Sequence, residues 1–197
     1  LASEVNVSEP AVLFIHSSPG TSAELAAAGL YGTAFNPFSA MSVRFHIDLS
    51  HNIYFKSAMT DATPFDPDNP FGTQFSFGSV DGSFYIHELA YFKNEHYKFA
   101  IGVWDFSKLA GSGYYFNGDY QFSEQFHPFL RYGRALEDAQ DFEANTVIGF
   151  TSLNWGLMFS RTTFSNYIDV NEPEDAYELS YQKAHEQFSF TPNLQYI

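Results

Sequence analysis

Residues 41–49 read M-S-V-R-F-H-I-D-L, and this stretch decides the fold class. The apolar residues Val43 and Phe45 alternate with the charged or polar residues Arg44 and His46. Alternation with a period of two residues predicts a β-strand that has one apolar and one polar face. Because Arg, His and Asp stand together on the polar face, that face must meet water. The stretch therefore predicts a strand that separates an apolar environment from an aqueous one.

The same pattern recurs along the rest of the chain. Residues 53–56 follow 41–49 after a very short connection, which predicts an antiparallel hairpin. Further strands are expected at residues 84–92, 97–106, 114–122, 129–134, 144–151, 155–163, 177–182 and 187–196. Within 114–122, one face is expected to carry Tyr114, Phe116, Tyr120 and Phe122, and the other Tyr115, Asn117, Asp119 and Gln121. The last strand, 187–196, has the clearest alternation. In 84–92, Glu88 shares a face with Phe84 and Ile86, so the phase of that strand is less clear.

The connections between these strands alternate between short and long. Short turns are expected near residues 50, 95, 124, 153 and 186, and longer loops near 70, 110, 139 and 170. Barrels of the bacterial outer membrane have tight periplasmic turns and longer external loops. Each strand also approaches the ~9–11 residues that a tilted membrane-spanning strand requires. The sequence therefore predicts an all-β protein, an antiparallel transmembrane β-barrel, with about ten to twelve strands in this chain.

Composition agrees with this fold and excludes several function classes. The chain of 197 residues is expected to form one domain over residues 1–197, and 19% of its residues are aromatic, which suits lipid interfaces. No stretch approaches the ~20 apolar residues of a spanning helix, so a helical membrane protein is excluded. The absence of Cys excludes disulfides, thiolate metal sites and a Cys nucleophile. A net charge of −14 argues against nucleic acid as a partner.

The N-terminal part, residues 1–41, is poorly readable and leaves two interpretations open. Residues 11–16 and 29–35 could be two strands with a turn at 17–20. Alternatively, part of the segment lies inside the barrel.

Several phrases, in their order, resemble the carbohydrate-selective porin family over residues 29–197. They are N-P-F-S-A-M-S-V-R-F (36–45), N-I-Y-F-K-S-A (52–58), Glu88 with Ala90 and Tyr91, Y-K-F-A-I-G-V-W (97–104), G-Y-Y-F-N-G-D-Y-Q (113–121), F-L-R-Y-G (129–133), Y-E-L-S-Y-Q (177–182) and F-T-P-N-L-Q-Y-I (190–197). The closing phrase is the most specific. The resemblance implies a barrel of about sixteen strands that passes sugars. Because this chain supplies fewer strands, we expect a fragment that lacks the family's first and last strands; a smaller complete barrel is the alternative.

Residues on the polar faces of the strands are the candidates for lining a pore. Arginine and aspartate can hydrogen-bond to sugar hydroxyls, and aromatic rings can stack on sugar rings. Alternatively, such residues merely solvate the barrel wall. The candidates are Arg44, His46, Asp48, Tyr54, Lys56, Glu88, Lys98, Trp104, Tyr115, Asn117, Asp119, Arg131, Asn145 and Glu178.

The function expected from this pattern is passive, carbohydrate-selective diffusion through a water-filled barrel in the outer membrane of a Gram-negative bacterium. Such a channel is not an enzyme, needs no cofactor or metal, prefers neutral or cationic sugars over anions, and has lipid and small sugars as its partners. It can assemble as a homo-oligomer. Two alternatives stay open. An outer-membrane enzyme that acts on lipids could use Ser160, near Arg161, although no G-x-S-x-G motif is present. A soluble sugar-binding β-protein would expose an extensive Phe and Tyr surface to water.

Overall fold

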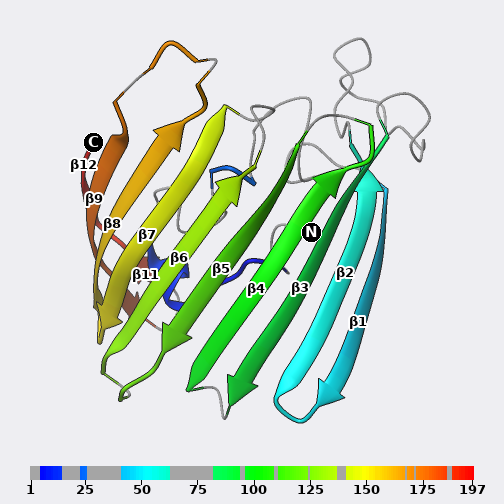
Figure 1. Ribbon diagram of the computed structural model, residues 1–197. Helices are drawn as coiled ribbons and strands as arrows, with labels where there is room; N and C mark the ends of the chain where they lie inside the picture. The colour runs from blue at the N-terminus through cyan, green and yellow to red at the C-terminus, as the bar shows by residue number, and fades with distance from the viewer. Residues whose placement is uncertain are drawn as a thin grey trace.

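The computed structural model describes residues 5–14, 23–25, 41–62, 82–93, 96–108, 111–123, 125–136, 141–166, 168–170, 172–185 and 188–197. Ten strands of this part form one antiparallel sheet, in which each strand pairs with the next (Figure 1). They are β1 (Ser42–Ser50), β2 (Ile53–Asp61), β3 (Ser83–Lys93), β4 (Tyr97–Phe106), β5 (Ser112–Tyr120), β6 (His127–Ala135), β7 (Phe142–Ser152), β8 (Trp155–Phe164), β9 (Glu174–Tyr181) and β12 (Asn193–Tyr196). The expected all-β, antiparallel architecture is confirmed.

Two smaller elements complete the described part. Strands β10 (Lys183–His185) and β11 (Phe188–Phe190) form a separate two-stranded sheet, and a 3₁₀-helix, η1, covers Pro10–Leu13. The residues that the structure describes include no helix with the length and apolar character of a membrane crossing. The twelve described strands match the expected number.

Among the described residues the sheet is open and does not close into a barrel, so the smaller complete barrel that the sequence left as an alternative is not observed there. β1 pairs only with β2, and β12 pairs only with β9, so these two strands form the edges. A barrel closes when its first and last strands come into hydrogen-bonding register, which depends on strand number and stagger together. The ten strands of this sheet do not bring β1 and β12 into register.

The expected alternation of short and long connections is only partly observed, because the expected short turn between β5 and β6 spans residues 121–126 and the expected long loop between β4 and β5 spans residues 107–111; residues 109–110 and 124 lie outside the described part. At one end of the sheet, β1–β2 and β7–β8 are joined by residues 51–52 and 153–154. At the other end, β6–β7 and β8–β9 are joined by residues 136–141 and 165–173, and β2–β3 by 62–82, of which residues 63–81 lie outside the described part. We call these the turn end and the loop end of the sheet; they lie at the bottom and the top of Figure 1.

Two sequence expectations are corrected. The continuous strand predicted at 187–196 is divided into β11 and β12, because Pro192 lacks the N–H that a ladder needs and only its carbonyl bonds, to the Tyr181 N–H at 3.1 Å. The turn predicted near residue 186 falls between β10 and β11, and residues 186–187 are outside the described part. The strand proposed for 11–16 is wrong for residues 11–13, since Pro10–Leu13 is a 3₁₀-helix that begins at proline; residues 15–16 lie outside the described part. The strand proposed for 29–35 and the turn at 17–20 lie outside the described residues.

The sheet has an inner face, against which the N-terminal residues 5–14 and 23–25 pack, and an outer face. Figure 1 shows the blue N-terminal segment behind β5 and β6. On β4, the inner residues Ala100 and Trp104 are buried, whereas the outer residues Ile101 and Val103 are 58% and 53% exposed. The described residues of the N-terminal part therefore pack against the inner face of the sheet, and the interpretation that part of this segment lies inside a barrel stays a prediction.

Two apolar clusters hold the N-terminal segment on the inner face. Towards the loop end, Val5 and Leu25 pack with residues of β2 to β6, among them Phe84, Ile86 and Trp104. Further along the segment, the second cluster consists of Ala11, Leu13, Phe14, Phe129, Val147 and Met158. The burial of these side chains removes apolar surface from water at both ends of residues 5–14, which stabilises the segment in this position.

Candidate functional site

All fourteen candidate residues lie on the inner face. Residues directly opposite each other in neighbouring strands share a face, and the register gives rows across the sheet. One row runs from His46 through Lys56 to Glu88, and another from Asp48 through Tyr54 to Ala90. The face assignments for residues 114–122, and Glu88 with Phe84 and Ile86 on one face, are confirmed by burial and pairing.

Six of the candidates line a hollow of about 700 Å³ between the sheet and the N-terminal segment. They come from four strands and are His46, Asp48, Tyr54, Lys56, Lys98 and Asp119. Val7 and Glu9 form the side of the hollow that the N-terminal segment contributes. The hollow therefore has a wall of hydrogen-bonding side chains on one side and a chain segment on the other.

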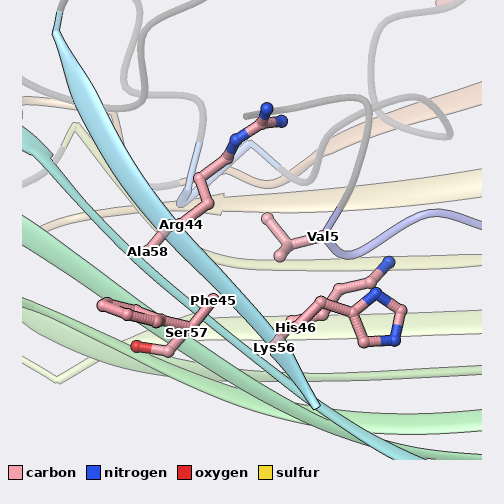
Figure 2. A pocket seen from close by; sticks show the side chains of 7 residues that line it. All are labelled: Val5, Arg44, Phe45, His46, Lys56, Ser57 and Ala58. Atoms are coloured by element: carbon pink, nitrogen blue, oxygen red, sulfur yellow. The ribbon is translucent and has the colours of Figure 1, made fainter. Parts of the chain in front are cut away.

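A second hollow of about 360 Å³ adjoins the β1–β2 hairpin. Figure 2 shows Arg44, His46 and Lys56 on the side of the hairpin that faces Val5, with Phe45 and Ser57 pointing away from it. His46 and Lys56 line both hollows, so the two spaces lie next to each other along the inner side of the hairpin.

Charges of both signs meet at the larger hollow. The His127 Nε2 atom lies 3.4 Å from Asp119 Oδ1, and the Lys56 ammonium lies 4.7 Å from the centre of the Tyr54 ring. Lys98 is surrounded by the charges of Glu88, Asp119 and Lys56. Such a mixture of donors, acceptors and one ring face suits a neutral polar solute with several hydroxyl groups.

Glu88 stands at the centre of a buried polar cluster. Its side chain is 0% exposed, and its carboxylate accepts hydrogen bonds from the Tyr54 hydroxyl at 3.1 Å and the Tyr115 hydroxyl at 2.9 Å. A third bond, at 2.7 Å, comes from the backbone N–H of Asn6. A buried carboxylate is tolerated only where donors such as these replace its water.

Asn6 and Val7 receive three further bonds from neighbouring strands. Arg131 Nη2 donates to the Asn6 carbonyl at 2.6 Å, and Asn117 Nδ2 donates to Asn6 Oδ1 at 3.1 Å. Lys98 Nζ donates to the Val7 carbonyl at 2.7 Å. Arg131 and Asn117 are almost completely buried, so they face the N-terminal segment and not an open channel.

The last three candidates lie away from both hollows. Trp104 belongs to the apolar cluster towards the loop end. Asn145 donates to the hydroxyls of Ser160 and Thr162 on the adjacent strand, at 3.2 and 2.9 Å. Glu178 accepts from Ser180 at 2.7 Å and from Gln195 at 3.0 Å. Asn145 and Glu178 therefore take part in hydrogen bonds between side chains of the sheet itself.

Sequence reasoning missed Asn6 and Val7 as members of the site. One signal was available: Phe84 and Ile86 share the polar face of their strand with Glu88. Apolar residues on a face that meets water indicate that another part of the protein covers them. The sequence did not identify residues 5–14 as that cover.

Ser160, the residue on which the enzyme alternative depended, is 1% exposed on the inner face. Its hydroxyl lies 3.2 Å from Asn145 Nδ2, in the middle of strand β8. The described residues also contain no group of three or more His, Asp or Glu that could hold a metal ion.

Comparisons of the chain with protein-family models, with curated proteins and with solved structures gave no match.

Proposed function

We propose that this chain forms part of the wall of an outer-membrane β-barrel, through which sugars and other small polar solutes diffuse passively. The observation that carries the proposal is the outer face of the sheet. Apolar side chains occupy it across all ten strands, and many are at least 40% exposed; they include Phe45, Ile47, Leu89, Phe99, Ile101, Val103, Leu130, Ile148, Leu157, Leu179 and Leu194. Soluble monomers avoid so continuous an apolar surface, whereas lipid requires one.

Aromatic residues lie at two levels of the outer face. At the turn end, Tyr97 packs against Tyr91 and Tyr120 at 5.8 and 5.7 Å between ring centroids, and Trp155 against Tyr181 at 4.6 Å. At the loop end the paired rings of this face are Tyr114 and Tyr132. Aromatic girdles at the two interfaces are typical of outer-membrane barrels.

The height of the sheet supports the same proposal. A ten-residue strand such as β4 is ~33 Å long at about 3.3 Å per residue, and a tilt of ~40° reduces this to a height of ~25 Å, that of the apolar band in these barrels. Ion pairs stand at the loop end of the outer face: Arg134 with Glu143 at 2.7 Å, and Arg161 with Asp175 at 2.6 Å. Charged side chains at the loop end are expected where the membrane surface meets water.

The proposal includes further strands. Among the described residues, β1 and β12 each leave one edge without a partner strand, and backbone groups left unsatisfied in lipid are not tolerated in a membrane. Additional strands that pair with both edges would complete a barrel of about sixteen strands, as the resemblance to carbohydrate-selective porins implies. A ten-stranded barrel would instead require β1 and β12 to pair with each other.

The polar hollow supports sugars as the solutes. Hydroxyl groups can donate to Asp48 and Asp119 and accept from Lys56 and Lys98, all of which line it. The net charge of −14 disfavours anions near the protein, so we propose a preference for neutral or cationic sugars.

Single-channel conductance of the full-length protein in a planar bilayer tests the proposal. We expect discrete open steps that glucose and maltooligosaccharides block in a saturable manner. Asp48→Asn should weaken this block, because Asp48 lies in the hollow; Asp175→Asn, at the loop end of the outer face, should leave it unchanged.

Steps that ignore sugars would contradict carbohydrate selectivity and leave a general porin. Folded, inserted protein that gives no steps would contradict the channel and return attention to the enzyme. Protein that stays soluble without detergent would favour the sugar-binding alternative.

A further inference from the structure

We propose that residues 5–14 are a constriction held inside the barrel by a buried anchor, and that release of this anchor widens the pore. This inference rests on the proposed channel function. It concerns which part of the chain limits solute size.

The anchor joins one short segment to four neighbouring strands. Asn6 bonds through its N–H to Glu88 of β3, through its side chain to Asn117 of β5, and through its carbonyl to Arg131 of β6. The next residue bonds through its carbonyl to Lys98 of β4. The backbone of Asn6 turns sharply here, with φ at +55°, a conformation that asparagine adopts more readily than most residues. Two consecutive residues therefore hold the segment across the inner face.

The groups that form these hydrogen bonds, which we call the anchor, are largely buried, so they can be satisfied only while the segment lies in this position. Asn6, Glu88, Asn117 and Arg131 are each at most 2% exposed. The charge of Arg131 lies close to that of Glu88 and also to that of Glu24, in the other described part of the N-terminal segment. If the segment moved away, these buried groups would lose their hydrogen-bond partners. The donors and acceptors of the strands therefore match those of the segment.

The segment is fixed at a second point. Phe14 packs against Phe129 of β6 with 5.7 Å between ring centroids, and Leu13 and Phe14 occupy the space above Gly156 of β8. A Cβ atom on Gly156 would lie 2.6 Å from Leu13 Cδ2 and 2.8 Å from Phe14 Cζ. The anchor at Asn6 and this apolar contact hold residues 5–14 from both ends.

The position of the segment sets the size of the open space. Residues 10–14 cover the inner face of β6 to β8, whereas Val7 and Glu9 border the hollow of about 700 Å³ that β1, β2, β4 and β5 line. While the segment is in place, the larger hollow of the described part lies on the β1–β5 side, and a smaller one of about 400 Å³ lies at the turn end beside Pro10, Val12 and Leu13. Its release would add the space over β6 to β8 to the pore.

Conductance of anchor variants tests this inference. We compare Arg131→Met and Lys98→Met with the controls Arg134→Met and Lys93→Met, which remove the same residue types from the outer face. Arg134 lies on the same strand as Arg131, and Lys93 pairs with Tyr97 at the turn end of the outer face. We expect about a twofold rise in conductance, and block by longer maltooligosaccharides, in the anchor variants alone, because the open cross-section increases.

A labelling experiment makes the result independent of channel activity. The chain has no cysteine, so Ser8→Cys introduces a single thiol at a position that is 2% exposed. With the anchor intact, the thiol should be protected from a hydrophilic maleimide. Combined with Lys98→Met or Arg131→Met, it should react about tenfold faster, as expected when a local opening becomes easier.

The outcomes separate this inference from the proposed function. A wild type that conducts, with anchor variants of equal conductance, would overturn the constriction whether or not labelling rises, and would leave the channel intact. A silent wild type with conducting anchor variants would support the constriction in a closed form. If wild type and variants insert but are all silent, the channel and the constriction both fail.

Discussion

Ile101→Lys should destabilise the protein in a lipid bilayer by about 2–4 kcal/mol, the cost of a lysine on the lipid side of a barrel at mid-depth. Ile101 is 58% exposed at the middle of β4, on the outer face between Phe99 and Val103. In a soluble protein, lysine at so exposed a position would change stability little. Urea unfolding of the protein in vesicles measures the difference.

Asp105→Lys is the matched control, since Asp105 stands on the same face of β4, four residues towards the loop end. The penalty for lysine falls to about 0–1 kcal/mol near the interface, so this variant should fold nearly as well as the wild type. Equal stability of the two variants in vesicles would contradict insertion with this face towards lipid.

Glu88→Ala should lower the free energy of unfolding by about 3–5 kcal/mol, the range for removing one partner from a buried charged cluster. The change leaves the hydroxyls of Tyr54 and Tyr115 and the N–H of Asn6 without their acceptor. It also removes one of the two negative charges, of Glu24 and Glu88, that lie near the Arg131 guanidinium. Chemical unfolding in detergent or vesicles gives the value.

Two variants show whether burial causes this effect. Glu143→Ala removes a carboxylate from an exposed pair with Arg134 and should have little effect. Glu88→Gln keeps the shape of the side chain but puts an NH₂ group where one donor now binds, so its loss should lie between those of the other two. A Glu88→Ala protein as stable as Glu143→Ala would mean that the cluster does not hold the N-terminal segment.

The strands could be predicted because their pattern is local. Side chains alternate between the two faces of a strand, so residues 114–122 revealed their own phase without knowledge of any neighbour. The alternation failed where local chemistry interrupts the ladder: Pro192 divides the final strand, although the residues around it alternate regularly.

The sequence by itself determined an antiparallel sheet and which residues of each strand lie on its polar or apolar face. These features follow from the period of two and from turn residues, which act over a few positions. Only the tertiary structure decided what covers the inner face. The bonds from Asn6 to Glu88, Asn117 and Arg131 join positions 82, 111 and 125 residues apart. No local sequence pattern marks such partners. Their hydrogen bonds contribute to stability only when the folded sheet brings the buried donors and acceptors together.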